Sequence, residues 1–525
     1  MPRSFGMMPP TSPFGAIPLL FLTAANSDFL LFLQEAHALL VRSPELIACA
    51  EADLDAHGCR KKALRVADAQ WRTERTERLP GLVVEPAVVD PARLTLARGR
   101  PRTPGYLVLI AVLFRGYFGA GFKACDSLTM MQESMTLRVF FENIGHPMPH
   151  AGTLTELCNA ITNETRLRML DAQVAMILEL GFDDFSMMLQ DSTHVDGNTA
   201  WPTDSRLLVK LVARVLRVGG SLGRLGLPSF TSVAAHRHLA VMTTLDREID
   251  MSKGTKAGKL KRTRRYRSIL WRARRAHGML SKEVARVEVA LASLDVLPSR
   301  KAMAERAVLR LRTDVDLLLP VIANCKARVI FAKKVPTKDK TFSVVDPDAG
   351  FIAKGQRVPV VGYKPQVARS GGGFVTGLLL PQGNAADSNQ LVPMVDEVIR
   401  RTTVVPTILS VDDGYSSLAN KEAMKALHIE VISINGSKGR ALTAPADWRS
   451  EAYANARDAR SAIESLMFTL KDGFDFDHVA RRGLSAAHGE LLEKVLAYNT
   501  CRVAQVRAAR TAEANSDDGE FADAA

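Results

Sequence analysis

Two aspartates each follow a short apolar run, the position at which a sheet exposes reactive groups. Met187 to Leu189 lead to Asp191, and Ile408 to Val411 lead to Asp412. Each run has the composition of a buried strand and gives way to a polar loop. Open sheets bind their ligands beyond the carboxyl ends of such strands. Either aspartate alone could equally be a turn former or a helix cap, so a third group is needed to indicate chemistry.

The third group is Glu464, on a predicted helix from about Asn455 to Leu470. At about 100° per residue, four charged side chains of this region fall within about 60° of one another. They are Arg457, Arg460, Glu464 and Lys471. One acid among three bases suits a metal-binding carboxylate flanked by phosphate-binding cations. It suits an exposed face of i, i+4 ion pairs equally well.

The segments around these acids predict a mixed sheet with helices on both faces. Three strand-like runs in a row are followed by alternating helix and strand, which with the run at 187–189 gives an α/β core. The strand-like runs are 187–189, 341–345, 358–367, 374–380, 408–411 and 428–434, with a helix at about 391–401. Residues 206–335 have helical periodicity nearly throughout, after an N-cap at Thr203 or Asp204.

Residues 1–180 are predicted to be mostly helical. A helix at about Cys125 to Phe141, followed by one with a capping box at Thr153 and Glu156, would form a helix pair. This pair could be a DNA-binding helix-turn-helix or a plain packing element.

The net charge of +13 and pI near 9.5 favour a polyanionic partner. The segment from Lys253 to Arg275 holds eleven Lys or Arg residues and no acid, with Tyr266 and Trp271 interleaved. Such a run can be a solvated face, but its density and aromatics also suit phosphate contact. The candidate DNA-binding side chains within it are Arg262, Arg264, Arg265 and Arg267.

The remaining composition indicates a reduced, non-membrane environment. Six cysteines are scattered with no CxxC pair, as expected of core thiols in a cytosol. The apolar run from Leu107 to Phe114 ends at Arg115, too short for a membrane span.

Four motifs resemble insertion-sequence transposases with an RNase H-like catalytic core, in particular the ISNCY group. The likeness covers roughly residues 130–505. Its motifs are Asp191-Ser192-Thr193-His194 with Pro202 to Ser205; Ile352 to Gly355; Asp412-Asp413-Gly414-Tyr415-Ser416 with Gly436 to Gly439; and Arg460, Glu464 and Lys471 at spacings of four and seven. The last matches a tyrosine, arginine, glutamate and lysine signature, except that Arg457 stands where the tyrosine would be.

The resemblance implies a DDE transposase. Asp191, Asp412 and Glu464 would be the catalytic and metal-binding acids, with Asp412 rather than Asp413 in the second place. They would hold Mg²⁺ or Mn²⁺, as two ions about 3.5–4 Å apart. Arg460 and Lys471 would bind phosphates near the scissile bond.

The implied partners are DNA, as terminal inverted repeats and target, and further copies of the chain assembled on it. The chain would act in the bacterial cytoplasm, at the nucleoid, and not at a membrane. Two alternatives stay open: an RNase H-like nuclease without strand transfer, and a non-catalytic DNA-binding protein derived from a transposase.

The expected architecture is an RNase H-like core interrupted by a long helical insertion, after an N-terminal all-α domain. The predicted boundaries are 1–180 for the N-terminal domain, which could bind DNA, and 181–205 for the first part of the core. The insertion with the basic segment would take 206–335, the rest of the core 336–507, and a disordered acidic tail 508–525.

Overall fold

The computed structural model describes most of the chain. The described residues are 24–77, 102–118, 134–143, 145, 147–199, 203–336, 339–353 and 359–522. They divide into two compact units, one made of residues 1–57, 101–199 and 348–525 and the other of 58–100 and 200–347. No helix in the described part of the chain is long and apolar enough to cross a membrane.

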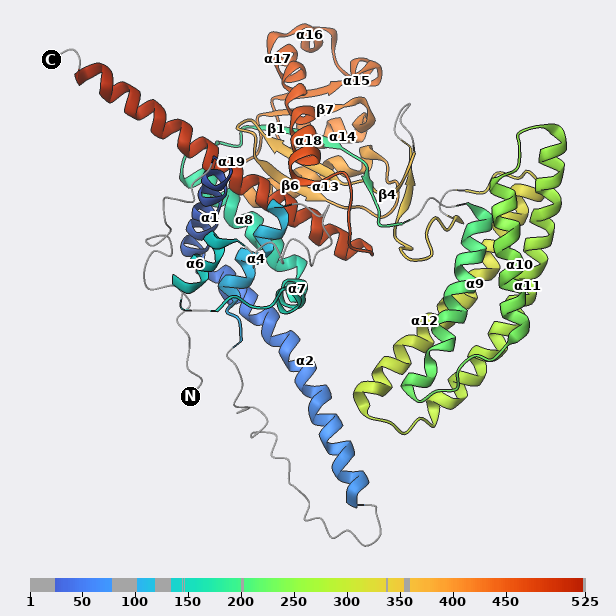
Figure 1. Ribbon diagram of the computed structural model, residues 1–525. Helices are drawn as coiled ribbons and strands as arrows, with labels where there is room; N and C mark the ends of the chain where they lie inside the picture. The colour runs from blue at the N-terminus through green and yellow to red at the C-terminus, as the bar shows by residue number, and fades with distance from the viewer. Residues whose placement is uncertain are drawn as a thin grey trace. The chain divides into compact units, whose positions relative to one another are not determined.

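The first unit contains a five-stranded sheet of order β6-β5-β1-β7-β8 (Figure 1). Its central strand β1 runs parallel to β7 and antiparallel to β5, β7 is parallel to β8, and β5 is antiparallel to β6. The strands are β1 (Met187–Ser192), β5 (Gln366–Ser370), β6 (Val375–Leu379), β7 (Ile408–Asp412) and β8 (Val431–Asn435). The mixed sheet predicted from the sequence is confirmed, and three antiparallel strands extended by two parallel ones give it RNase H-like topology.

Both faces of the sheet are covered, because neighbouring strand residues point to opposite sides. Met188 packs with Leu409 in the core beneath α13 (Leu391–Thr402) and α14 (Leu418–Ala426). Leu189 belongs to the opposite core, with α18 (Ser461–Phe474) and α19 (Leu484–Ala522). Alternation along β1 therefore assigns each residue to a face.

A smaller sheet of order β2-β4-β3 follows the end of β1. Its strands are β2 (Val195–Asp196), β3 (Gly350–Ile352) and β4 (Val360–Tyr363). A side chain at Gly362 would collide with the Val195 carbonyl, 1.9 Å from an added Cβ, so close pairing of β2 and β4 requires glycine there.

The helices near the N-terminus share the core of α18 and α19. They are α1 (Ala24–Arg42), α4 (Gly105–Tyr117), α6 (Met135–Asn143), α7 (Ala151–Ala160) and α8 (Asn163–Glu179). The apolar run at 107–114 is buried in α4. Helix α7 begins two residues before the predicted capping box, because the His150 ring caps it by accepting from the Gly152 amide at 3.1 Å.

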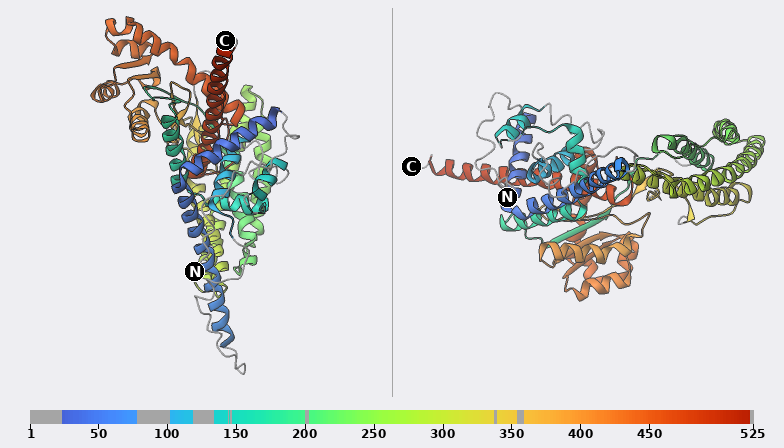
Figure 2. Two further views of the ribbon diagram at one scale, coloured as in Figure 1. Left: turned by 90° about the vertical axis from the view of Figure 1, so that its left-hand side faces the viewer. Right: turned by 90° about the horizontal axis from the view of Figure 1, so that it is seen from below.

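The second unit is a helical bundle with its own apolar core. Its long helices run alongside one another (Figure 2): α9 (Asp204–Gly220), α10 (Val233–Asp250), α11 (Lys256–Ala292) and α12 (Pro298–Cys325). Thr203 caps α9 by accepting from the Arg206 amide, which confirms the predicted start. The part of α2 (Pro44–Glu77) from Gly58 onward belongs to this unit, where Trp71 donates to Asp295.

The structure differs from the prediction in several segments. The run 341–345 forms no strand, because the Ser343 hydroxyl accepts from the amides of Val345 and Asp346 and turns the backbone. The predicted helix at 455–470 is two helices, α17 (Glu451–Ala459) and α18, which meet at Arg460. The tail predicted to be disordered lies within α19, which continues to Ala522.

Candidate active site

Asp191 and Asp412 lie side by side at the carboxyl end of the sheet. Strands β1 and β7 are parallel and pair Gln190 with Val411, so the next residue of each strand is one of the two acids. Alternation puts both on the face covered by α18, because Leu189 belongs to that core and Val411 to the opposite one. The sequence predicted the strand ends, and the parallel pairing brings the two acids together.

Backbone amides orient both carboxylates. Asp191 is 7% exposed, and its Oδ1 accepts from the Ser192 amide at 2.7 Å. Asp412 Oδ1 accepts from the Gly414 amide at 2.9 Å and caps the short helix Asp413–Tyr415, η6. Each carboxylate is thus fixed by its own loop.

Arg460 joins the third acid to the first. Its guanidinium lies 2.8 Å from Glu464 Oε1 and 3.8 Å from Asp191 Oδ2. The Glu464 side chain is 60% exposed, whereas that of Asp191 is 10% exposed. Two of the three predicted acids, Asp191 and Glu464, therefore lie beside one cation, with Glu464 on its solvent side.

Lys471 bonds α18 to the loop after β1, whereas Arg457 pairs with its neighbour on α17. Lys471 Nζ donates to the His194 carbonyl at 3.3 Å. The side chains of Arg460, Glu464 and Lys471 keep the predicted stripe. Arg457 lies on α17, beyond the break between the helices, and pairs with Asp458 at 3.5 Å.

Asp413 has a separate structural role. Its carboxylate accepts from the amides of Gly439 at 2.9 Å and Lys438 at 3.3 Å, at the start of α15 (Ser437–Leu442). Partial desolvation opposes the shift, but these amide hydrogen bonds lower the pKa of Asp413. Asp413 thus anchors α15, whereas Asp412 lies beside Asp191.

A fourth acid, Asp387, lies against the same site and was missed by sequence reasoning. A Cβ added at Gly414 would lie 3.0 Å from Asp412 Oδ1 and 3.2 Å from Asp387 Oδ2. The other Asp387 oxygen accepts from Lys364 and from Gln366, each at 2.8 Å. Desolvation opposes the shift, but these bonds lower the pKa of Asp387.

Tyr415 lies beneath these carboxylates. Its buried hydroxyl donates to Gln366 Oε1. Burial raises the pKa of Tyr415 well above its usual value, and the charges of Asp387, Asp191 and Asp412 raise it further. The charges of these three carboxylates thus raise the pKa of the same buried hydroxyl.

The donor set fits a hard divalent cation. Mg²⁺ and Mn²⁺ favour carboxylate oxygens, and Asp191 and Asp412 supply them from adjacent strand ends. The absence of a side chain at Gly414 keeps the space between Asp412 and Asp387 open. Asp191 and Asp412 are the adjacent acids that would hold such an ion. Glu464 lies on the solvent side of Arg460, and in the described part of the chain the ligand atoms of the three acids do not all lie within 4.8 Å of one another.

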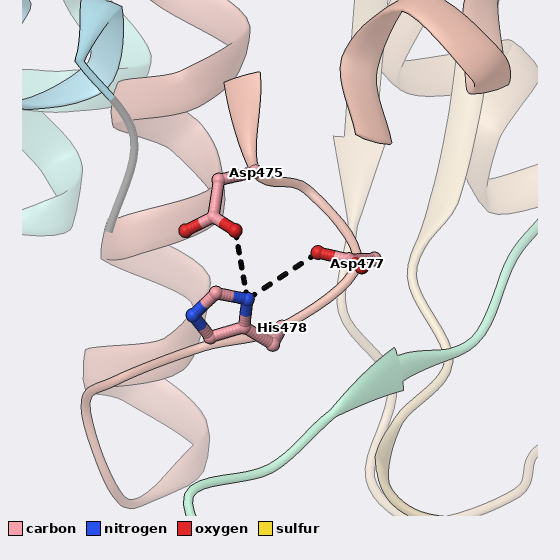
Figure 3. A group of neighbouring side chains, drawn as sticks. All are labelled: Asp475, Asp477 and His478. Carbon is pink, nitrogen blue, oxygen red and sulfur yellow. Dashed lines mark hydrogen bonds and ion pairs between the residues drawn. The ribbon is translucent and has the colours of Figure 1, made fainter. Parts of the chain in front are cut away.

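Another acidic group lies at the end of α18 (Figure 3). Within the described residues, one group of three His, Cys, Asp or Glu side chains has ligand atoms that all lie within 4.8 Å of one another. It consists of Asp475, Asp477 and His478. His478 Nδ1 lies 2.8 Å from Asp475 and 3.3 Å from Asp477. Buried Lys494 donates to the Asp475 and His478 carbonyls at 2.6 and 2.7 Å. Bonds to His478 and to the buried Lys494 thus hold this loop together within the protein.

The four candidate arginines of the basic segment lie on α11, in the second unit, and they differ in their surroundings. Arg265 pairs with Glu248 at 2.7 Å, and Arg262 donates to the Ser252 carbonyl at 2.8 Å. Arg264 and Arg267 are exposed.

Arg264 and Arg267 belong to one exposed stripe of α11. The stripe continues at helical spacing through Trp271, which is 53% exposed, to Arg274 and Arg275. The Arg275 guanidinium lies 5.5 Å from the centre of the Trp271 ring. Tyr266, the other interleaved aromatic, is buried in the bundle core. The structure therefore separates the segment into a cationic outer stripe and an inner packing face.

Comparison with known proteins bears on the part of the chain that contains two of the three acids. Residues 333–500 match the family model described as "Transposase DDE domain". The matched range includes Asp412 and Glu464, while Asp191 precedes it. No curated protein and no solved structure matches the chain.

Proposed function

We propose that this protein is a DNA transposase of the DDE class, related to the ISNCY group, that cleaves transposon ends and joins them to target DNA. One observation carries the proposal: Asp191 and Asp412 lie side by side on parallel strands, and Arg460 links Asp191 to Glu464. The family match over residues 333–500 supports it.

The proposed reaction is two in-line displacements at phosphorus. In the first, a water molecule loses a proton and its oxygen bonds to phosphorus, the P–O3′ bond breaks, and the 3′-oxygen takes up a proton. In the second, the freed 3′-hydroxyl loses its proton and attacks a target phosphate, and the displaced 3′-oxygen takes up a proton. When bound, two Mg²⁺ or Mn²⁺ ions supply charge stabilisation for the attacking and leaving oxygens.

The side chains around the acids suit a phosphate ligand. Arg460 Nε and Asn435 Nδ2 are buried donors that have no partner within the described residues. Asn435 pairs with Asp412 across β7 and β8. Buried donors without an acceptor are costly, and a phosphate oxygen is the acceptor that a DNA substrate would bring. Lys471 would add charge beside it.

DNA binding outside this site is assigned to the exposed stripe of α11. Phosphate contacts of Lys and Arg supply sequence-independent affinity, and the stripe carries cations with no acid. Terminal inverted repeats and target DNA are the proposed partners, with copies of the chain assembled on them. The place of action would be the nucleoid in a bacterial cytoplasm.

The deciding experiment measures both displacements. Full-length protein is incubated with Mg²⁺ and a plasmid carrying the ends of the element that encodes it. Nicking at the ends and joined products support the proposal. Nicking without joining would indicate a plain nuclease, and binding without metal-dependent nicking would indicate a non-catalytic DNA-binding protein.

A further inference from the structure

The surroundings of Asp387 differ from those of an ordinary buried ion pair. Asp387 lies in the short helix Asp387–Gln390, η5, which precedes α13 on the face of the sheet opposite α18. Its Oδ1 accepts from Lys364 Nζ, and Lys364 also donates to the Ala385 carbonyl at 3.1 Å. The side chains of Asp387 and Lys364 are 13% and 9% exposed. One oxygen of the carboxylate is thus held by a buried cation.

The second oxygen approaches Gly414, two residues after Asp412. Asp387 Oδ2 lies 3.2 Å from the Cβ position of Gly414, and Asp412 Oδ1 lies 3.0 Å from the same position. The two oxygens are therefore at most about 6.2 Å apart. Gly414 is not one of the described glycines with a positive φ. Its lack of a side chain therefore matters for space and not for backbone freedom.

The hydrogen bonds around Asp387 connect it to β1 and β5 of the sheet. The Ser192 hydroxyl bonds to Asp387, and Ser192 directly follows Asp191. Gln366 pairs with Ser192 across β5 and β1, and it donates to Asp387 at 2.8 Å. Asp387 is therefore held by neighbours of the first acid and faces the second.

We propose that Asp387 is a fourth carboxylate of the metal site, which presents Oδ2 to a divalent cation held by Asp191 and Asp412 while Lys364 holds Oδ1. A cation between carboxylates on the two sides of Gly414 would be favoured by both charges. Lys364 orients Asp387 and keeps it charged, as partners beyond the direct ligands commonly do for metal-bound groups. This inference rests on the proposed metal-dependent function.

The test measures Mn²⁺ binding to the full-length protein without DNA, by calorimetry and by electron paramagnetic resonance. Asp387→Asn is expected to raise the Mn²⁺ Kd at least about 10-fold, the lower end of the effect of losing a supporting group. Gly414→Ala is expected to raise it too, because the methyl group would occupy the space between the two oxygens. The matched control is Asp396→Asn, which removes an exposed carboxylate of α13 and should leave the Kd unchanged.

A second variant separates metal binding from the folding role of the ion pair. Lys364→Met with Asp387→Asn removes both members, a change that buried pairs often tolerate. The double variant is expected to bind Mn²⁺ as weakly as Asp387→Asn. Wild-type affinity in either variant would overturn the inference, since Asp387 would then serve only Lys364.

Asp412→Ala provides the reference. If it abolishes Mn²⁺ binding while Asp387→Asn binds normally, the fourth carboxylate is refuted and the proposed function stands. If Asp412→Ala also binds normally, the proposed metal site itself is refuted.

Discussion

At the scale of single residues, two adjacent amino acids with the same side chain have different surroundings. Asp412 ends a strand beside Asp191, and Asp413 accepts amide hydrogen bonds from the start of α15. Asp191→Ala, Asp412→Ala or Glu464→Ala is expected to reduce strand cleavage by at least about 10²- to 10³-fold, the loss typical of one preorganised electrostatic group. DNA binding and folding should be largely retained, as gel shifts and circular dichroism would show.

Asp413→Asn is the matched control for those variants. An asparagine oxygen can still accept from the amides of Gly439 and Lys438, so α15 should stay in place. Cleavage near the wild-type rate is expected. A loss as large as that of Asp412→Ala would assign the second acid to Asp413.

Arg460 should affect metal binding and catalysis in opposite directions. Its guanidinium pairs with Glu464 and approaches Asp191. Removing this positive charge with Arg460→Gln should tighten Mn²⁺ binding, by about two- to fivefold for a partly exposed pair worth up to about 1 kcal/mol. Cleavage should slow, because a donor for the substrate phosphate is lost. Weaker Mn²⁺ binding in this variant would show that Arg460 chiefly positions the acids.

The sequence predicted three acids and did not point to Asp387. Asp191 and Asp412 were predicted because apolar runs precede them, and Glu464 because its spacing from Arg460 and Lys471 resembles the transposase signature. Asp387 lies in a polar stretch after a glycine, where an aspartate commonly forms a turn or caps a helix. Its nearness to Asp412 depends on the packing of η5 against η6, which no local pattern encodes.

At the scale of elements, the exposed stripe of α11 gives a defined DNA-binding prediction. Arg264→Gln with Arg267→Gln removes two exposed cations, so the log–log dependence of DNA affinity on salt should flatten by about 1.8, at about 0.9 per contact with B-DNA. Sequence preference should persist, because phosphate contacts carry no sequence information. Fluorescence anisotropy at several salt concentrations measures both.

Arg286→Gln is the control on the same helix. Arg286 lies beyond the basic segment and pairs with Glu283 at 2.6 Å, so removal of its single charge should leave the slope unaltered. A slope that stays unchanged in the double variant as well would make the stripe a solvated face. Arg262 and Arg265 should contribute less, because they bond to Ser252 and Glu248.

The predicted elements were confirmed where the apolar pattern was long, and they were wrong where side-chain hydrogen bonds redirect the backbone. The strands at β1, β7 and β8 and the helices of the bundle were foreseen from continuous apolar periodicity. The break between α17 and α18 was not, because Arg457, Arg460 and Glu464 still fit one helical stripe across it. The Ser461 hydroxyl donates to the Asp458 carbonyl at the break, a local bond that competes with helix continuation.

At the scale of the whole molecule, the first unit is held together by a buried charge that the sequence does not reveal. Glu493 on α19 accepts from Arg115 of α4 at 2.5 Å and from Arg166 of α8 at 2.7 Å, and it also pairs with Arg481. The side chains of Arg115, Arg166 and Glu493 are at most 4% exposed. A glutamate within a helix would ordinarily be assigned to an exposed face, so only the packed helices show this cluster.

Removal of this charge should loosen α4, α8 and α19 together. Desolvation opposes the shift, but Arg115, Arg481 and Arg166 hold the pKa of Glu493 well below its usual value. A lowered folded-state pKa stabilises the protein above the unfolded-state pKa, and this contribution is lost as the pH falls through the folded-state value. Glu493→Gln should lower the free energy of unfolding at pH 7 by about 3–5 kcal/mol, the cost of leaving buried partners unpaired.

Hydrogen exchange in urea tests this, followed by mass spectrometry on peptides from the three helices. The wild-type protein should lose protection as the pH falls below about 4.5, the usual pKa of a glutamate. Glu493→Gln should exchange faster at pH 7 and show a weaker dependence on pH in that range. Glu142→Gln, an exposed glutamate of the same unit, should behave as the wild type. Equal protection of Glu493→Gln and wild type at pH 7 would mean that apolar packing alone holds α4 and α8 against α19.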